Sequence, residues 1–424
     1  MRILIIHQWF ATPTQPGGTR HYELASQLVQ RGHECAIVTS NVSYVTGEKI
    51  VDGRGLVIEQ RAGGLRILRA YTYASIHRSF AGRLVSFLSF MATSVWAAMR
   101  VRNVDLVMGT SPPLFQAVSA WLVALIRRRP FLLEVRDLWP EFAIDLGVLT
   151  NPVLIKLSRW LERFLYARAT HFLVNSPAYR DYLVGRGIPS EKISLIANGV
   201  DPDMFQPQAE GRAIRGQLGL DGKFVVTYAG ALGMANDIET ILQAAARLRD
   251  DRAIHFLFVG GGKEQANLEK LARELKLDNV TFAGGRPKNV MPDVLAASDA
   301  CLATLKDIPM FRTTYPNKVF DYMAAGRPTI LAIDGVIRHV VESAGGGIFV
   351  PPGDATALAE AVRSLRADPD RARSMGLAAR RYVQQHFNRH TQAAEFADLL
   401  EQLSHRNGHP TSESPVSEVR QTCA

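Results

Sequence analysis

The amino-acid sequence predicts an α/β protein built from two successive halves of the same kind. Buried strands alternate with amphipathic helices along most of the 424 residues, which is typical of parallel sheets covered by helices. Glycine-rich loops follow several of the strands, and a polar segment at 198–221 interrupts the pattern once before it restarts. The length indicates two or three domains, and we place the boundary in this segment.

The first half opens with an apolar strand at 3–7, a loop that ends in Gly17-Gly18, and a helix over 20–31. A second strand at 35–39 completes a strand–loop–helix–strand unit. The glycine pair lets the backbone approach a ligand closely, although a glycine pair alone is a weak signal. Further parallel strands are expected at 105–109, 131–135, 171–175 and 193–196.

The second half repeats the alternation. Strands are expected at 225–229, 255–259, 280–282, 300–304 and 329–333, with helices between them. Helices over 355–366, 370–386 and 390–404 follow, and the polar end of the chain is expected to be disordered. The predicted domains are residues 1–200 and 201–385, followed by a C-terminal helix at 386–404 and a tail at 405–424.

The stretch 315–342 concentrates groups that suit a phosphate-bearing ligand. It predicts a polar loop, a helix that starts near Pro316 and ends at Gly326, and a buried strand. Helix N-termini present unsatisfied N–H groups and a partial positive charge to phosphates. Lys318 supplies a point charge, and Asp321 supplies an acceptor for ribose hydroxyls. The alternative is an ordinary loop–helix–strand with a surface lysine and aspartate.

A second candidate site is the turn at 136–141, Arg-Asp-Leu-Trp-Pro-Glu, which follows a predicted strand. Ligand sites of open α/β sheets form at the carboxyl ends of such strands. Asp137 and Glu141 bring two carboxylates close to an arginine and a tryptophan, and this density of functional groups favours a site. The alternative is a loop stabilised by salt bridges.

The charge of the chain is distributed unevenly. Residues 1–200 contain 23 Lys and Arg against 13 Asp and Glu, a balance of +10, within a net charge of +9 for the whole chain. A basic half predicts a polyanionic surface as partner, and without a nucleic-acid-binding signature we expect an anionic membrane and no nucleic acid. Two apolar stretches beside arginines, 84–99 and 117–126, are short for a membrane span of roughly 20 residues. They predict either buried helices or helices that lie in a membrane surface.

Other features predict a cytoplasmic chain without a metal site. The three cysteines are widely spaced, which fits a reducing compartment, and the N-terminus lacks the features of a signal peptide. Asp201-Pro202-Asp203 has the spacing of a metal-binding pair of aspartates. It lies in the boundary turn, where aspartate is favoured for local hydrogen bonding, so we predict no metal there.

Several motifs together resemble the retaining nucleotide-sugar glycosyltransferases of family four. These enzymes have the GT-B fold, in which two Rossmann-like domains face each other across a cleft. The matching stretches are Gly17-Gly18, the turn at 198–201, the glycine loops at 228–230, 259–262 and 282–284, and the segment 320–328. The resemblance covers about residues 1–400 and implies a C-terminal helix that returns to the N-terminal domain. The stretches 136–141 and 316–318 resemble a bacterial branch that works on O-antigen and capsule repeat units.

The sequence departs from this family at four positions. The family's Glu-x7-Glu pattern is replaced by Thr313 and Asp321, and its usual diphosphate-gripping Arg and Lys are replaced by Ala231 and Asn236. Other cations must then meet the phosphate charge. By resemblance, the expected donor-binding residues are Gly17, Gly18, Gly230, Gly284, Arg286, Arg312, Asn317, Lys318 and Asp321, and the expected catalytic residues are Asp137, Glu141 and Lys318.

The resemblance implies transfer of a sugar, with retention, from a nucleotide diphosphate to a lipid-linked saccharide acceptor in cell-surface polysaccharide biosynthesis. UDP is the expected nucleotide, an N-acetylated amino sugar is the expected donor sugar, and no cofactor or metal is expected. The expected location is cytoplasmic, peripheral on the inner face of the plasma membrane. Two alternatives stay open: a nucleotide-sugar epimerase, which needs carboxylates poised for proton abstraction, and a non-catalytic nucleotide-binding scaffold of a polysaccharide complex.

Overall fold

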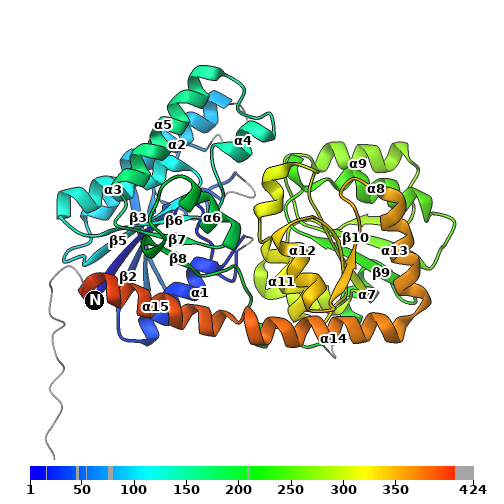
Figure 1. Cartoon of the computed structure of the whole chain (residues 1–424). Helices are drawn as coiled ribbons and strands as arrows, with labels where there is room; N and C mark the ends of the chain where they lie inside the picture. Colours follow the sequence, from blue (N-terminus) through cyan, green and yellow to red (C-terminus); the bar gives the residue numbers. More distant parts are fainter. Residues whose placement is uncertain (16, 44–46, 54, 75–79, 208–210, 406–424) are drawn as a thin grey trace, which may run out of the picture.

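The computed structural model describes the chain except for residues 16, 44–46, 54, 75–79, 208–210 and 406–424. The expected disordered tail therefore lies outside the described residues, apart from His405. Two α/β domains lie side by side, each with a central sheet and helices on both faces (Figure 1). The first sheet has eight strands in the order β3-β4-β2-β1-β5-β6-β7-β8, and the second has six in the order β11-β10-β9-β12-β13-β14.

The first domain contains every element up to β8 and also the last helix of the chain. Its strands are β1 Arg2–Ile6, β2 Glu34–Ser40, β3 Val57–Ala62, β4 Leu65–Ala70, β5 Leu106–Ser111, β6 Phe131–Val135, β7 His171–Val174 and β8 Ile193–Leu195. Its helices are α1 Arg20–Gln30, α2 Phe80–Met99, α3 Leu114–Arg127, α4 Glu141–Asp145, α5 Pro152–Arg168, α6 Pro177–Gly185 and α15 Arg389–His405.

The second domain follows a linking segment after β8, and its six strands are all parallel. They are β9 Phe224–Ala229, β10 Ile254–Val259, β11 Val280–Phe282, β12 Ala300–Thr304, β13 Thr329–Ala332 and β14 Gly347–Phe349. The helices are α7 Arg212–Leu218, α8 Ile238–Arg247, α9 Gln265–Glu274, α10 Met291–Ala296, α11 Asn317–Ala324, α12 Val336–Ser343, α13 Ala355–Ala367 and α14 Pro369–His386.

The β3–β4 hairpin, which is the antiparallel edge of the first sheet, was not predicted from the sequence. Charged residues such as Glu59 and Arg66 obscure its pattern of alternation. Gly63 and Gly64 form the connection, with φ of +57° and +79°. Two consecutive residues with positive φ are typical of the tight turns that join hairpins, so the glycine pair was the available signal.

The two faces of the first sheet pack against different helices. Successive strand residues point to opposite faces, and Leu4 and Ile6 therefore join the core under α2, α3 and α5. Ile3 and Ile5 join the core under α1 and α15 on the other face. The helices that follow β4, β5 and β6 thus form one continuous layer.

The last helix crosses from the second domain back to the first, as the resemblance implied. Phe396 and Leu400 of α15 are fully buried in the same core as Leu24 of α1. The two passages of the chain between the domains are hydrogen-bonded to each other. The N–H of Val200 donates to the carbonyl oxygen of Phe387 at 3.1 Å, and the N–H of Arg389 donates to that of Val200 at 2.9 Å.

The domains also touch through the 3-10 helix η5, Pro309–Thr313. Phe311 of η5 stacks on Phe142 of α4 with ring centroids 5.6 Å apart. The Ser176 hydroxyl donates to the carbonyl oxygen of Thr313 at 2.5 Å. Thr313, which replaces a glutamate of the family pattern, therefore takes part in a contact between the domains.

We predict that Phe396→Ala lowers the free energy of unfolding by about 3 kcal/mol, because it leaves a cavity in a core shared by α1 and α15. Urea titration followed by circular dichroism measures the change. Glu395→Ala, at an exposed position of the same helix, is the matched control and should stay within about 0.5 kcal/mol of the wild type. Equal stability of the two variants would contradict the packing of α15.

Candidate functional site

A cavity of about 910 Å³ lies between the two domains and is lined by both. The first domain contributes Trp9, residues 17–20, Glu23, Arg83, Phe87 and Leu146. The second contributes the ends of β9 and β10, the loop 260–262, Arg286, Lys288 and the first residues of α11. Several of these segments follow carboxyl ends of parallel strands, where ligand sites of open α/β sheets form.

The glycines of the second domain let backbone segments meet at the cavity. A Cβ atom on Gly260 would overlap the carbonyl oxygen of Gly230, and one on Gly262 would overlap that of Leu232. The ends of β9 and β10 therefore pack without side chains, which leaves their peptide groups at the cavity wall. Such exposed backbone groups are suited to contact a ligand closely.

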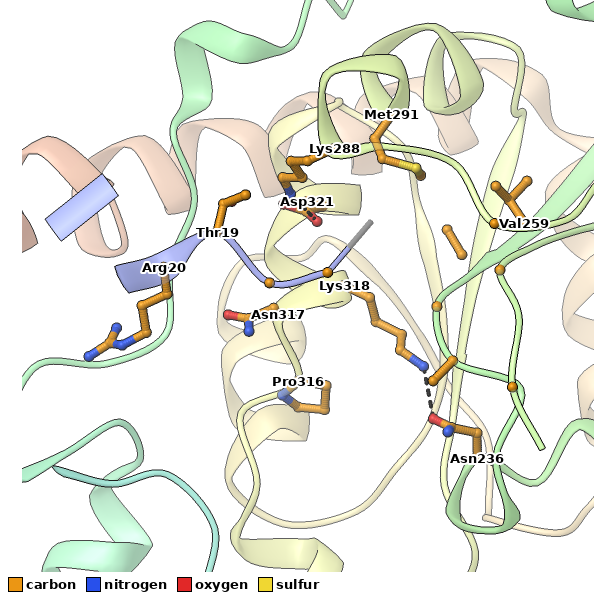
Figure 2. A pocket seen from close by; sticks show the side chains of 18 of the residues that line it. Thr19, Arg20, Asn236, Val259, Lys288, Met291, Pro316, Asn317, Lys318 and Asp321 are labelled. Carbon is orange, nitrogen blue, oxygen red and sulfur yellow. Dashed lines mark hydrogen bonds and ion pairs between the residues drawn. The ribbon is translucent and has the colours of Figure 1, made fainter. Parts of the chain in front are cut away.

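Lys318 extends from the first turn of α11 across the cavity (Figure 2). Its ammonium donates to the hydroxyl of Tyr228 at 2.5 Å and to Oδ1 of Asn236 at 3.0 Å, and it lies 4.1 Å from the centre of the Tyr228 ring. Burial lowers the pKa of Lys318 to about 7. Within the described part of the chain no carboxylate pairs with it, so all its partners are neutral, and at this pKa the ammonium and the neutral amine are both populated near pH 7.

Asn236 stands where the family pattern has a phosphate-binding lysine, and its side chain points at the Lys318 ammonium (Figure 2). The positive charge is therefore present near the expected place, although α11 supplies it in place of the loop after β9. Compensation of this kind is invisible in a motif comparison, because the two residues are 82 positions apart.

Asp321 lies one turn further along α11 and carries an ion pair. Its carboxylate accepts from the ammonium of Lys288 at 2.6 Å, and both residues line the cavity. Burial raises the pKa of Asp321, and Lys288 acts against this rise. Lys288 was not predicted from the sequence, although it follows Gly284, which was expected to bind the donor, by four residues. Any ligand hydroxyl that bound Asp321 would share its carboxylate with this lysine.

Seven of the nine residues expected to bind a donor line the cavity: Gly17, Gly18, Gly230, Arg286, Asn317, Lys318 and Asp321. Oδ1 of Asn317 is buried without a hydrogen-bond partner among the described residues, so it can still accept a bond from a ligand. Gly284 stands behind the wall, where its carbonyl oxygen accepts from the N–H of Gly260. Arg312 is exposed outside the cavity and pairs with Asp307 at 3.3 Å and Asp334 at 3.9 Å.

The two carboxylates expected to be catalytic do not line the cavity. Glu141 accepts two hydrogen bonds from Arg159 at 2.8 and 2.9 Å, and this pairing lowers its pKa. The alternative of a salt-bridged loop therefore describes Glu141. Asp137 is accessible to solvent but crowded by surrounding protein, which raises its pKa to about 6 against the pull of Arg136. The Tyr179 hydroxyl donates to its carboxylate at 3.5 Å.

A buried polar cluster fixes the start of α1 at the cavity. The carboxylate of Glu134 in β6 is fully buried and accepts from Arg20 Nε at 3.1 Å and His21 Nε2 at 2.5 Å. Burial alone would raise the pKa of Glu134, but His21 and Arg20 outweigh it and hold the pKa well below its usual value. Arg20 also donates to the carbonyl oxygens of Ile196 and Ala197. The sequence signal for this cluster was a glutamate inside an otherwise apolar strand.

His7 follows β1 and extends this cluster. Its ring lies against that of His21 with centroids 3.9 Å apart and a tilt of 33° between the ring planes, and its Nδ1 lies 2.8 Å from the Thr110 hydroxyl. Its Nε2 lies 3.4 Å from Arg136. Because arginine only donates, Nε2 must accept, which places the proton of the neutral ring on Nδ1. Burial, reinforced by the charges of His21 and Arg136, holds the pKa of His7 well below 6.5.

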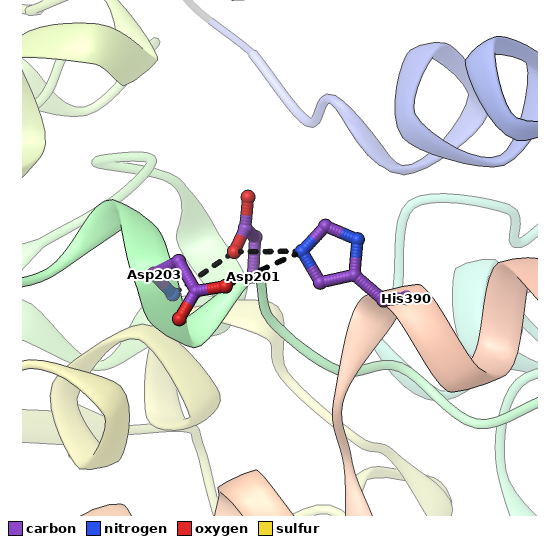
Figure 3. A group of neighbouring side chains, drawn as sticks. All are labelled: Asp201, Asp203 and His390. Carbon is purple, nitrogen blue, oxygen red and sulfur yellow. Dashed lines mark hydrogen bonds and ion pairs between the residues drawn. The ribbon is translucent and has the colours of Figure 1, made fainter.

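Asp201, Asp203 and His390 meet where the two passages between the domains run together (Figure 3). His390 Nε2 lies 3.3 Å from the carboxylate of Asp201 and 3.7 Å from that of Asp203. Asp201 also accepts from the N–H of Asp203 at 2.9 Å, which is the local hydrogen bond that the turn sequence predicts. Asp203 and His390 are exposed, and of the three only Asp201 lines the cavity.

Comparison with known proteins agrees with this architecture. Residues 17–199 match the family profile described as "Glycosyl transferase 4-like domain", and residues 211–382 match "Glycosyl transferases group 1". The putative colanic acid biosynthesis glycosyl transferase WcaI of Escherichia coli is 24 % identical over 352 residues, 80 % of this chain and 86 % of that protein. The probable glycosyltransferase WbjE of Pseudomonas aeruginosa is 26 % identical over 314 residues, 73 % and 78 % of the two chains.

A solved structure shares the whole architecture. Anabaena Alr3699/HepE in complex with UDP-glucose superimposes with a TM-score of 0.71 at 20 % identity, over 95 % of this chain and all of that one. This likeness shows the GT-B fold, and the two family matches show that the protein is a glycosyltransferase. It belongs to the family that joins a glycosyl transferase 4-like domain to a group 1 domain, which confirms the family and fold that the motifs indicated.

We predict that the free energy of unfolding falls as pH is lowered from about 7.5 to about 5.5. Unfolded histidines bind protons near pH 6.5, whereas burial lowers the pKa of both His7 and His21 in the folded chain, so acid favours the unfolded state. Each contributes up to about 1.4 kcal/mol per pH unit below that point. His7→Asn, which keeps a polar atom near Thr110, should flatten this dependence in urea titrations.

The matched control is His339→Asn, because His339 is exposed. It should keep the pH dependence of the wild type. If the free energy of unfolding of His7→Asn and His339→Asn depends on pH in the same way, His7 is not kept neutral in the folded chain.

Proposed function

We propose that this glycosyltransferase moves a sugar, with retention, from a nucleoside-diphosphate sugar to a lipid-linked saccharide during assembly of a cell-surface polysaccharide. The observation that carries the proposal is the amino group of Lys318, which lines the interdomain cavity and has only neutral partners among the described residues. Its ammonium form lacks a counter-ion there, so an anion that supplies one favours the protonated form and is bound favourably. The diphosphate of the donor supplies that anion.

The names of similar proteins support the direction of the proposal. HepE was solved with UDP-glucose, and WcaI is named for colanic acid biosynthesis. UDP is the nucleotide we propose, and an N-acetylated amino sugar is the sugar we propose to test first. The cavity of about 910 Å³ is large enough to hold a donor together with the reacting end of an acceptor.

Charge builds up on the leaving diphosphate as the bond to the sugar breaks. Lys318, the N-terminus of α11 and the peptide N–H groups of the glycine loops can stabilise this charge in fixed positions. Binding of the diphosphate raises the pKa of Lys318 again, because a nearby negative charge favours the ammonium. Gly18 faces the same cavity from the first domain and can donate its N–H to the phosphate.

The carboxylates of the cavity support a mechanism without a protein nucleophile. Glu23 accepts from Arg389 at 2.7 Å and from the Thr19 hydroxyl at 2.5 Å. Asp321 is paired with Lys288, and Asp201 with the backbone. Among the described residues that line the cavity, each carboxylate thus already has a partner. We propose front-side attack, in which the leaving phosphate takes the proton of the acceptor hydroxyl.

The same pairing argues against the epimerase alternative, which needs carboxylates free to abstract a proton. The scaffold alternative drew on the replacement of the family's cations by Ala231 and Asn236. Lys318 beside Asn236 restores one of these charges and favours catalysis. Asp137 and Glu141 keep only a proposed role in orienting the acceptor when the domains move.

The direct test is a donor screen with a polyprenyl-diphosphate-linked sugar as acceptor, read by mass spectrometry. The proposal expects one donor to add a single sugar with the anomeric configuration of the donor. Incubation with donor alone is the second arm, and conversion of its sugar would establish an epimerase. Nucleotide binding without either product would establish the scaffold.

We predict that Lys318→Ala lowers kcat by roughly 10²–10³-fold and raises KM for the donor much less. The contact with the phosphate strengthens as negative charge develops, so its loss falls mainly on the transition state. Lys306→Ala, at an exposed position of the same domain, is the control and should keep the wild-type rate. Wild-type kcat in the Lys318 variant would rule out this role.

We predict that transfer continues at its full rate in excess EDTA, because fixed cations and helix N–H groups do the work of a divalent ion. Added magnesium or manganese should change the rate less than about twofold. The opposite outcome is loss of activity that manganese restores. The variants Asp201→Asn and Asp203→Asn would then show whether the group at the domain passages holds the ion.

A further inference from the structure

The outer surface of the first domain exposes a broad apolar face. Helices α2, α3 and α5 cover the same side of the first sheet, and α3 packs against both of the others. We call their solvent side the outer face. Its exposed large apolar residues are Leu84, Val85, Leu88, Trp96 and Met99 of α2, Leu125 and Ile126 of α3, and Val153, Leu157 and Trp160 of α5. Isolated exposed apolar residues are normal on soluble proteins, but ten on three adjacent helices of one face indicate an interaction that uses them.

The exposed residues follow the helical period. Leu84, Leu88, Ala92 and Trp96 recur every four residues along α2, and all are exposed. Val153, Leu157 and Trp160 form a similar stripe on α5. Residues at this spacing lie on one side of a helix. Each helix therefore has an apolar stripe toward the solvent as well as the apolar side that it buries against the sheet.

Helix α2 is long and apolar enough to cross a membrane by length and composition, over Ala81–Met99. Its inner side, however, belongs to the domain core, where Phe90, Ala97 and Ala98 are fully buried. A spanning position would pull these residues out of the core. Contact of the outer stripe with a surface, without spanning, is compatible with the fold. The earlier stretch 117–126 lies mostly against the core, with only its end exposed.

The exposed charges on these three helices have one sign. The three helices contain a single acidic residue, Glu162, and it is fully buried. Exposed basic residues lie beside or just beyond the apolar stripes at positions that include Arg100, Arg102, Lys156 and Arg163. The ends of α2 and α3 are joined, because Arg127 donates to the carbonyl oxygen of Met99 at 3.1 Å. An apolar face with basic residues at its margin is complementary to an anionic bilayer.

The cavity opens along one of these helices. Arg83 and Phe87 of α2 line the cavity, whereas their neighbours Leu84 and Leu88 belong to the outer face. Phe87 also stacks on Phe115 of α3 with ring centroids 5.8 Å apart. The first turns of α2 thus separate the interdomain cavity from the exposed apolar surface by the width of one helix.

We propose that the outer face docks on the anionic inner leaflet of the plasma membrane, with Trp96 and Trp160 at the depth of the head groups. Tryptophan prefers this depth because its ring is apolar and its N–H is polar. In this orientation the cavity lining at Arg83 and Phe87 lies next to the bilayer. A lipid-linked acceptor can then present its sugar to the cavity while its chain stays in the membrane, a consequence that rests on the proposed function.

Flotation of the full chain with liposomes tests the docking. Vesicles of phosphatidylcholine with about 30 % phosphatidylglycerol should carry the protein upward at about 0.05 M salt, and pure phosphatidylcholine much less. Binding should fall as salt rises to about 0.5 M, because the Debye length shrinks. The tryptophan fluorescence of the protein should shift to shorter wavelength on binding, because Trp96 and Trp160 enter the bilayer. The double variant Trp96→Ser, Trp160→Ser should not show this shift.

Two variant sets separate the apolar and the electrostatic contributions. Leu88→Glu with Leu157→Glu should lower the vesicle partition coefficient at least tenfold, whereas Leu56→Glu, an exposed leucine outside the face, should not change it. The set Arg102→Gln, Lys156→Gln and Arg163→Gln should lower it about fivefold per residue. The matched set Arg249→Gln, Arg252→Gln and Lys276→Gln, all exposed in the second domain, should leave it unchanged.

Three results would overturn the docking: no flotation of the wild type at low salt, equal flotation of the Leu88/Leu157 variant, or a wild-type dimer that this variant separates. The third would assign the face to a second copy of the chain. Flotation needs no turnover, so its outcome is independent of the transfer assay. If the wild-type chain floats with the vesicles but transfers no sugar, the docking surface is supported and the proposed function is wrong. If it transfers sugar but never floats, the proposed function is supported and the docking surface is wrong.

Discussion

The buried carboxylate of Glu134 holds together the first domain's side of the cavity. It is stable without solvent only because Arg20 and His21 both donate to it. Removing one partner from such a buried group typically costs about 3–5 kcal/mol, since the remaining charge stays buried. Through Arg20 the same contact reaches the carbonyl of Ile196, so β6, α1 and the chain that leads to the second domain are fixed together. The Gly17-Gly18 loop therefore faces Lys318 from a defined position.

The parts of the fold that could be predicted from the sequence are those in which burial separates apolar residues clearly from polar ones along the chain. The strands of the second domain are apolar runs between glycines, and β11 and β12 lie where the sequence placed them. Helix α5 was not assigned, because Leu165 faces the core while Val153 and Leu157 face solvent, and apolar residues on both sides hide the helical period. The hairpin β3–β4 was not predicted either, because its charged residues hide the alternation of apolar and polar positions that marks a strand.

In the candidate site, features that depend on neighbouring residues in the sequence could be predicted. Contacts between residues far apart in the sequence could not. Lys318 was singled out because a helix begins there after a polar loop, and Asn317 beside it was implied by the family resemblance; both signals are local. Glu141 was singled out for its neighbours in sequence, but its partner Arg159 is 18 residues away and makes it part of a surface ion pair. The Lys288–Asp321 pair spans 33 residues. Contacts of this range depend on how helices pack, which a motif does not specify.

The order of synthesis has a consequence for how this chain matures. One face of the first sheet is complete only when Phe396 and Leu400 of α15 arrive, although the strands that they cover are made first. The strands of that face are complete at about residue 196, so at roughly 5–20 residues per second the face waits about 10–40 s on the ribosome for its covering helix. The second domain can fold during this interval, as an insertion between β8 and the helix that closes the first. Loss of the last helix would therefore leave an apolar face of the first sheet exposed. The second domain of the same chain would by then already be folded.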